Sequence, residues 1–362
     1  MRNKMLITLL TLLGAISCTS VETMGSLRIE FETGALQTKA DNPDGVVADG
    51  GGIYFTGNGT EQDPYRPDLI IVVADSNGDI QGKYIGTSAS NTNSKLEGTP
   101  LSTKMSVSIT GLTGPATYTV YAFANTLGLW TMTNGVSNLA TDLANGTITT
   151  ASQLEALQFQ PVVDNDEDAY GCLFVKNDRL PLSAKGTVTL KASGNGEVAL
   201  SLLRCVAKVT AVFENQYGEV LTLTGFNNTF RHMNPSTGYV VPHESDFPIE
   251  WESAGNLAPG EATLTIGSVD NPQTEAREDR VSSSWYVFPS IGPYTCDISF
   301  TLYGESHSYS YLPVHDDHAR DILQLARNQH LTITTRISKG KQVSFSFKVA
   351  DWDTKTERVT FN

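Results

Sequence analysis

Alternation of apolar and polar residues is the dominant pattern along this chain. Leu27, Ile29 and Phe31 alternate with charged neighbours, which predicts a strand with one buried face. Residues 68–74 are nearly all apolar, as expected for a strand that is covered on both faces. Residues 75–79 contain an Asn-Gly pair, which is typical of a tight hairpin turn. The pattern therefore predicts an all-β protein.

Further strands and one short helix are predicted downstream. Residues 105–109 and 118–124 have the strand pattern and flank a turn that contains Gly and Pro. Residues 151–159 have apolar residues at helical spacing behind Ser152, which we expect to be the N-cap, with Glu155 three residues later. We therefore expect one or two short helices in a protein built mainly from strands.

The chain of 362 residues is long enough for two domains with separate cores. Strands resume near residue 186 and continue to residue 352, so each half is expected to form a sandwich of about seven short strands. We expect the N-terminal sandwich at residues 40–200 and the C-terminal sandwich at residues 201–362. The segment 232–271 is rich in Pro, Gly, Ser and Asn and is predicted to be a long loop between strands.

The first eighteen residues have the composition of a secretory signal. Arg2 and Lys4 precede a short apolar run at residues 5–13, and small or aliphatic residues lead into Cys18. The run is too short to cross a bilayer as a helix. Because the signal leads directly into a cysteine, we expect residues 1–18 to be a lipoprotein signal peptide and Cys18 to be acylated. Two or more acyl chains would then anchor the protein stably. The alternative is an ordinary signal peptide in which Cys18 has no special role.

Charge and cysteine content narrow the classes of partner. The net charge of -14 argues against a nucleic-acid partner, which requires a basic face. Cys172, Cys205 and Cys296 are the other cysteines, and their odd number and spacing predict neither a disulfide framework nor a metal site. Cys205 alternates with apolar residues, so we expect a buried and inert thiol.

The search for catalytic and metal-binding residues gives no assembled site. Motifs for a nucleophile elbow, a metalloprotease or a phosphate-binding loop are absent from the sequence, so we expect no enzyme activity and no cofactor. Residues 315–318 read His-Asp-Asp-His and could ligate zinc, but a solvated turn that opens a surface helix at 319–325 is the preferred interpretation. Asp75, Asn77 and Asp79 resemble the start of a calcium loop, but the position of the glycine favours a turn.

Several passages together resemble one family. They are Cys18 with its leader and the segments 111–125, 204–209, 285–289, 327–331 and 349–352. In their order and spacing these passages are similar to the fimbrillins of type V pili from Bacteroidales. The resemblance implies two tandem transthyretin-like Greek-key β-sandwich domains. It also implies a lipidated precursor at the outer membrane that a trypsin-like protease cuts after a basic residue downstream of the first strand. Loss of this strand opens a groove, which a strand of a neighbouring subunit then fills.

The resemblance assigns roles to residues at both ends of the chain. Lys39 and Ala40 would flank the cleavage site, so that residues 19–39 form a propeptide that includes the first strand; Lys39 departs from the arginine of the best-known relatives. The candidate donor strand is the C-terminal tail, Arg358, Val359, Thr360 and Phe361, in which apolar residues alternate. The alternative is that this tail is the last strand of its own domain.

Three functions are compatible with the sequence. The first is a structural pilus subunit at the cell surface, whose partners are other pilus subunits, the outer membrane through the lipid on Cys18, and a ligand on a host or bacterial surface. The second is a pilus anchor that keeps its lipid because Lys39 is not cut. The third is a glycan-binding surface lipoprotein, for which exposed aromatic platforms are expected. An enzyme has the least support.

Overall fold

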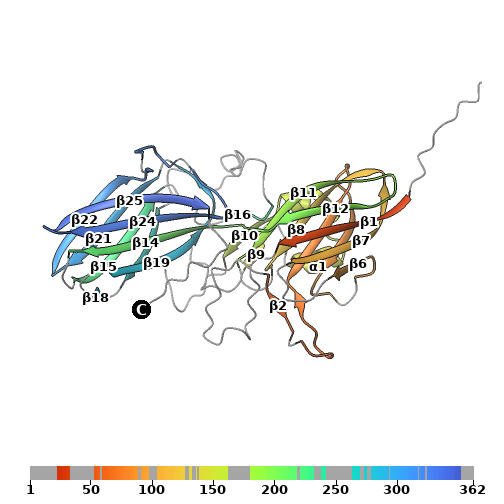
Figure 1. The fold of residues 1–362 in the computed structure, drawn as a ribbon, viewed down its shortest axis with the longest axis horizontal. Coiled ribbons are helices and arrows are strands. Elements are labelled where there is room, and N and C mark those ends of the chain that lie inside the picture. Colours follow the sequence, from red (N-terminus) through yellow and green to blue (C-terminus); the bar gives the residue numbers. More distant parts are fainter. Residues whose placement is uncertain are drawn as a thin grey trace, which may run out of the picture.

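The computed structural model describes residues 23–32, 53–57, 59–88, 91–97, 104–126, 130–132, 136, 138–161, 180–217, 221–231, 238–241, 263–269, 273–274, 279–292, 294–316, 318–322 and 324–351. These residues form mainly β-strands, arranged as two sandwiches that lie end to end (Figure 1). The predicted all-β fold is confirmed. None of the described helices is long and apolar enough to cross a membrane.

Two sheets form the N-terminal sandwich. The first has the order β12 (Gly196–Ser201), β1 (Thr23–Glu32), β7 (Lys104–Gly114) and β6 (Ser94–Glu97). The second has the order β13 (Leu203–Arg204), β11 (Leu182–Leu190), β8 (Ala116–Ala124), β4 (Leu69–Ala74) and β5 (Ile80–Ile85). A two-stranded ribbon, β2 (Phe55–Thr56) and β3 (Arg66–Pro67), precedes β4. The predicted strands at 27–31 and 68–74 are both present.

The second sheet of this sandwich is covered on both faces, which explains the composition of β4. Leu69, Ile71 and Val73 belong to the core between the two sheets. Ile70 and Val72 point the other way, into a second core. Because alternate residues of a strand face opposite sides of its sheet, a strand between two cores has to be apolar at every position. All six residues of β4 are buried.

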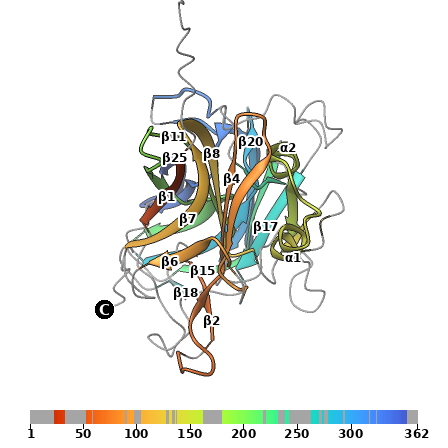
Figure 2. The same cartoon turned by 90° about the vertical axis from the view of Figure 1, so that its right-hand side faces the viewer.

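The second core lies under two short helices, α1 (Leu139–Ala144) and α2 (Ala151–Glu155), and a small sheet of β16 (Gly238–Tyr239), β10 (Gln158–Pro161) and β9 (Trp130–Met132). Figure 2 shows both helices on the side of β4 that faces away from β1. The helix predicted at 151–159 is present but ends at Glu155. Its N-cap is Thr150 and not Ser152, because Gln153 in the third helical position completes a capping box with Thr150. Asn138 caps α1, which the sequence pattern did not predict.

The C-terminal sandwich also has two sheets, around a single core. The first has the order β19 (Asp279–Val287), β14 (Ala207–Gln216), β24 (Gln329–Ser338) and β25 (Gln342–Asp351). The second has the order β17 (Thr263–Val269), β15 (Leu221–Arg231), β21 (Thr295–Leu302) and β22 (Glu305–Pro313). β18 (Gln273–Thr274) pairs with β15, and β20 (Ser290–Ile291) pairs with β23 (Gln324–Leu325).

The two sandwiches share much of their strand order, although the fourth strand of the first sheet lies beside β7 in one (β6) and beside β24 in the other (β25). In each, a central strand (β1 or β14) pairs antiparallel with one neighbour (β7 or β19) and parallel with the other (β12 or β24). In the facing sheets, β5-β4-β8-β11 corresponds to β17-β15-β21-β22, and every pairing is antiparallel. β1 and β14 therefore occupy equivalent positions.

The sandwiches are joined through the small sheet and the second core. β16 lies between β15 and β17 in sequence, yet it pairs with β10 beside the N-terminal sandwich, between the two lobes in Figure 1. Val240 and Phe288 are buried in the second core together with Phe159, whose ring meets that of Phe288 edge to face at a centroid distance of 5.2 Å. β13 pairs with β11 of the N-terminal sandwich. The domain boundary between residues 200 and 201 stays a prediction.

Candidate functional site

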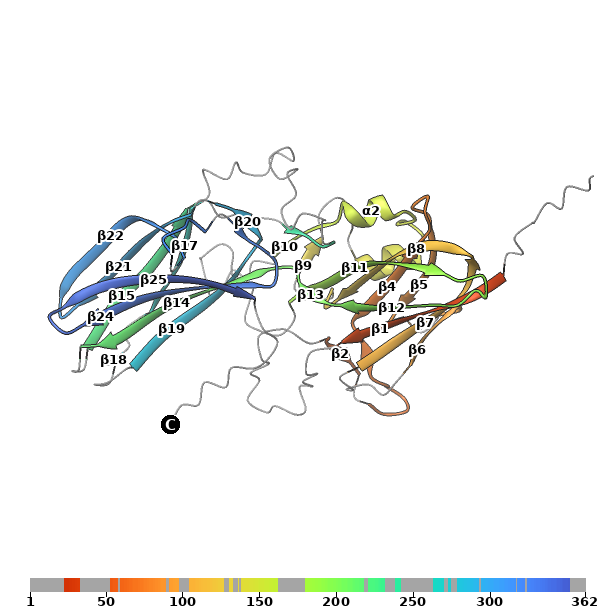
Figure 3. The ribbon, with the colours of Figure 1, turned by 45° about the horizontal axis from the view of Figure 1, so that its top comes forward.

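β1 is a central strand whose two edges are both occupied. All of its ten residues pair antiparallel with β7, and Leu27 to Glu32 also pair in parallel with Gly196 to Ser201 of β12. In Figure 3 β1 lies between β12 and β7 along most of the N-terminal sandwich. Removal of this strand would leave the facing backbone groups of both neighbours without partners.

Three side chains fix β1 to the core. Leu27, Ile29 and Phe31 have 0%, 0% and 1% of their surface exposed, and all three belong to the core between the two sheets. Arg28 and Glu30 point outward and form an ion pair at 3.1 Å. The alternation that the sequence predicted for this strand is confirmed. The inward face carries the stabilising contacts, because an exposed ion pair contributes little.

The start of β1 passes very close to the turn between β11 and β12. A Cβ atom on Gly25 would lie 1.5 Å from the carbonyl oxygen of Gly194. The hydroxyl of Ser26 donates a hydrogen bond to Oδ1 of Asn195 at 3.1 Å. The side chain of Met24 is 83% exposed. Backbone contact at Gly25, and not side-chain burial, therefore positions this end of the strand.

The predicted processing and donor residues lie outside the described residues. These are Cys18 for lipidation, Lys39 and Ala40 for cleavage, and Arg358, Val359, Thr360 and Phe361 for the donor strand. The nearest described elements are β1, which ends at Glu32, and β25, which ends at Asp351. Their assigned roles stay predictions.

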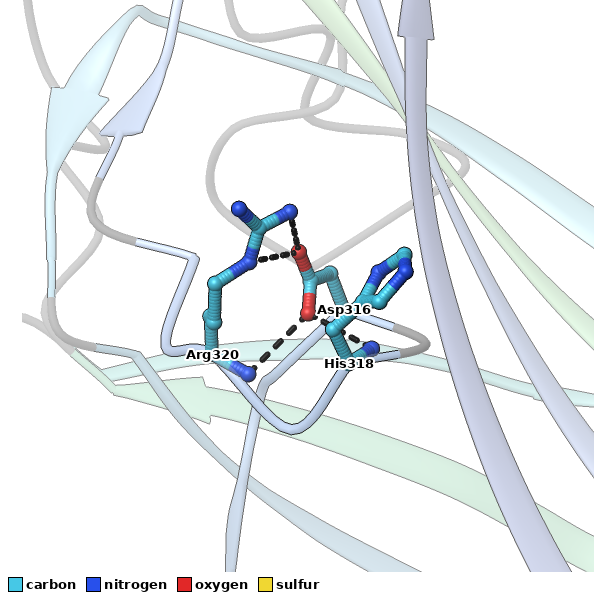
Figure 4. A network of polar contacts seen from close by, with 3 residues as sticks. All are labelled: Asp316, His318 and Arg320. Carbon is cyan, nitrogen blue, oxygen red and sulfur yellow. Dashed lines mark hydrogen bonds and ion pairs between the residues drawn. The ribbon is translucent and has the colours of Figure 1, made fainter.

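The described residues around Asp316 form a turn, which was the preferred interpretation, but the helix predicted at 319–325 is wrong, since the described residues 319–322 and 324–325 are not helical. Oδ1 of Asp316 accepts hydrogen bonds from the backbone N–H groups of His318 (2.8 Å) and Arg320 (3.0 Å), and Oδ2 accepts from the Arg320 guanidinium (Figure 4). A side chain that bonds local backbone groups competes with helix formation, and residues 324–325 form β23. These hydrogen bonds and the charge of Arg320 hold the pKa of Asp316 well below its usual range.

The described residues contain no group of three His, Cys, Asp or Glu side chains that could hold a metal ion. The turn predicted at residues 75–79 is confirmed. Oδ1 of Asp75 accepts from the backbone N–H groups of Asn77 and Asp79, at 2.8 and 3.1 Å. Gly78 supplies the positive φ angle of the turn, at 86°. The carboxylate that suggested a calcium ligand is thus engaged by the backbone of its own turn.

A buried polar cluster at the junction of the two sandwiches was not predicted. Nη1 of Arg327 donates to Oγ of Ser183 at 2.9 Å, and Nη2 donates to the carbonyl oxygen of Tyr239 at 3.0 Å. Arg327 is only 8% exposed. Nη1 of Arg204 donates to Oδ1 of Asn328 at 2.9 Å. Two of the passages that carry the family resemblance, 204–209 and 327–331, meet here, so those motifs mark a structural joint.

Cys205 lies in the same cluster and is buried, as predicted. Its Sγ is 3.3 Å from Oγ of Ser183. Burial raises the pKa of the Cys205 thiol, although the nearby charge of Arg327 opposes this effect. Reactive cysteines have lowered pKa values and partial exposure, so this thiol has the properties of an inert core residue.

Comparison with known proteins identifies structural neighbours. No protein-family profile and no curated protein sequence matches the chain. The crystal structure of a candidate cell adhesion protein from Bacteroides eggerthii is 15% identical, with a TM-score of 0.51 over 91% of this chain and 96% of that chain. A candidate adhesin from Bacteroides thetaiotaomicron is 13% identical, with a TM-score of 0.43 over 91% and 96% of the two chains. A fimbrial assembly protein from Parabacteroides distasonis is 11% identical, with a TM-score of 0.40 over 91% and 99%. The first of these shows a shared fold.

Proposed function

We propose that this protein is a structural, non-enzymatic subunit of a surface pilus that supports adhesion. It is exported as a lipoprotein precursor, acylated on Cys18 and held at the outer membrane. Cleavage between Lys39 and Ala40 removes the segment that contains β1. A strand of a neighbouring subunit then takes the place of β1, and repetition of this step builds the polymer.

The observation that carries the proposal is the position of β1. A strand near the start of a chain is often an edge strand that can be lost with little damage, but β1 is central and anchored by Leu27, Ile29 and Phe31. Its loss would open an apolar channel between β7 and β12, and only another strand has both the backbone donors and acceptors and the alternate apolar side chains to close it. The strand is thus suited to act as a removable plug.

The free energy that holds β1 in its place is large enough for a durable contact. Full burial of a Leu, Ile or Phe side chain contributes about 1.5–3 kcal/mol, so the three anchors together contribute about 5–9 kcal/mol before backbone hydrogen bonds are counted. The ordering of an incoming strand opposes part of this gain. A strand covalently joined to its own subunit would remain in place, and a neighbour's strand could replace it only after the connection is cut.

The comparisons and the sequence resemblance support the same proposal. The chain shares its fold with the Bacteroides eggerthii protein, which is described as a candidate cell adhesion protein. The fimbrillin-like passages of the sequence point to a pilus in particular. The predicted tail donor, residues 358–361, is one candidate for the incoming strand.

Limited proteolysis of the purified precursor tests the proposal. Trypsin should generate a product that begins at Ala40 and forms ladders of detergent-resistant multimers. The matched control is Lys39→Gln, which trypsin cannot cut at this position and which should remain monomeric under the same conditions. A cleaved protein that stays monomeric would contradict assembly by strand exchange.

Membrane attachment is tested separately. The variant Cys18→Ser should no longer partition with the membrane fraction of cells, whereas a serine substitution at the buried Cys205 should have no effect on partitioning. Retention of Cys18→Ser in the membrane would refute lipidation at this residue. Mature surface protein that still carries an acylated Cys18 would instead identify a pilus anchor.

A further inference from the structure

The contact between Gly25 and the β11–β12 turn has a consequence for the strand that replaces β1. A Cβ atom at this position would lie 1.5 Å from the oxygen, 2.2 Å from the carbonyl carbon and 2.5 Å from Cα of Gly194. All three are backbone atoms, so no rotation of a side chain can relieve the overlap. A residue other than glycine fits here only if one of the two backbones moves.

The turn has little freedom to move. The N–H of Gly194 donates to the carbonyl oxygen of Lys191 at 2.8 Å, and the N–H of Lys191 donates to that of Asn195 at 3.2 Å. The turn also lies close to β7, where a Cβ on Gly114 would lie 3.0 Å from the oxygen of Lys191 and 3.2 Å from Cα of Gly194. The turn is therefore in close contact with the backbones of two neighbouring strands, β1 and β7.

The backbone of β1 is also fixed near this point. Gly25 pairs with Leu112 and Ser26 pairs with Thr110, so Gly111 forms a bulge opposite the two residues. Gly111 has a φ angle of 82°, which residues other than glycine rarely adopt. Two residues further along, Leu27 enters the core. The steric restriction at Gly25 therefore lies at a fixed spacing of two residues from Leu27, the first apolar anchor.

We propose that the groove selects its partner strand by a glycine placed two residues before three alternate apolar residues. This inference rests on the proposed function and specifies the partner: a strand of another subunit that lies in the direction and register of β1. Its glycine takes the place of Gly25, and its apolar side chains take the places of Leu27, Ile29 and Phe31.

The predicted donor tail of this same chain does not have that pattern. If Val359 and Phe361 took the places of Leu27 and Ile29, Glu357 would stand at the glycine position. If they took the places of Ile29 and Phe31, Lys355 would stand there. In the direction of β1, the tail therefore brings a charged side chain against the carbonyl group of Gly194, and a strand of different sequence is the better partner.

Peptide binding to the cleaved protein tests the selection. After digestion with trypsin and inhibition of the protease, labelled peptides with the sequence of residues 23–32 are titrated. The natural peptide and its Met24→Val form should bind equally, because Met24 is 83% exposed. The Gly25→Val form should bind about tenfold more weakly or worse, and it should fail to block the multimer ladder. Equal binding of all three peptides would overturn the selection and leave strand exchange intact.

The intact precursor gives a second measurement that does not require assembly. Gly25→Val should lower the thermal midpoint and increase hydrogen exchange in residues 111–114 and 191–195, whereas Met24→Val should change neither. If the natural peptide does not bind and no multimers form, the proposed function fails, and the steric requirement is decided by this comparison alone. Equal stability and exchange in the two variants would overturn it.

Discussion

The anchoring of β1 can be tested by shortening its central buried side chain. Ile29 pairs with Val107 of β7 and with Val198 of β12, and it is fully buried in the core between the sheets. Replacement of a buried isoleucine by alanine typically costs about 2–5 kcal/mol, because the lost transfer energy is increased by the cavity that remains. We expect Ile29→Ala to destabilise the closed N-terminal sandwich by an amount in this range.

The matched control is the next residue of the strand. Glu30→Ala keeps the same backbone position but changes an outward side chain that is 45% exposed and pairs with Arg28. An exposed ion pair contributes about 0–1 kcal/mol, so this variant should remain close to the natural protein. The two substitutions separate the inward face of β1 from its outward face.

Hydrogen exchange followed by mass spectrometry measures the difference. A loss of about 3 kcal/mol raises the population of the state with β1 released by about two orders of magnitude. Peptides that cover β7 and β12 should therefore exchange faster in Ile29→Ala, while peptides from β24 in the C-terminal sandwich serve as an internal reference. Equal exchange of β12 in the two variants would refute the view that buried anchors hold the groove closed.

Other features of the structure lead to three further predictions. Arg327→Met should destabilise the junction by about 2–4 kcal/mol, because buried acceptors lose a charged donor. In calorimetry the two sandwiches should then unfold in separate transitions, whereas Arg320→Met, at an exposed position, serves as the control. A single unchanged transition for Arg327→Met would refute this role. Thr335→Val should stabilise the protein by about 1 kcal/mol in urea unfolding, because Oγ1 of the fully buried Thr335 has no hydrogen-bond partner among the described residues; a loss of stability would contradict this. The turn around Asp316 should keep its amide protection at about pH 3, because a lowered pKa leaves the carboxylate charged below the usual value of 3.8. Its contribution is present above that value and is lost only as the pH falls through the lowered pKa. In Asp316→Asn the protection should be weaker at every pH above the lowered pKa, and equal protection in the two proteins at about pH 5 would contradict this role.

The strands were predictable because a local pattern determines them. In β1 the alternation of Leu27, Ile29 and Phe31 with charged residues is a direct record of one buried and one exposed face. The composition of β4 likewise indicated a strand covered on both faces, and the structure provides two cores for it. In such segments the local sequence pattern and the tertiary environment both indicate the same secondary structure and burial.

The ends of helices and the polar junction were harder to predict from the sequence. Leu157 and Phe159, which follow α2, are buried in the second core, and Phe159 belongs to β10. The end of α2 is therefore determined by tertiary contacts. At 315–322 a single aspartate, Asp316, replaces the expected helix by bonding two backbone N–H groups. Arg327 and Ser183 are separated by 144 residues in the chain, so no local pattern could bring them together.

β1 and β14 occupy equivalent positions, but they differ in what precedes them in the chain, and this difference favours β1 as the strand that the proposed exchange replaces. Both strands are central, with one parallel and one antiparallel neighbour. β14 follows directly on Val206, which is buried in the second core and whose carbonyl oxygen accepts a hydrogen bond from the N–H of Asn328 at 2.8 Å. The buried side chains of β14 belong to the C-terminal core, so its withdrawal would uncover that core and pull on Val206 at the junction. β1 precedes every other described strand, and its buried side chains belong to the core between the two N-terminal sheets, away from the junction. Its removal opens a single groove while the rest of the molecule keeps its contacts, which is the condition that a replaceable strand has to meet.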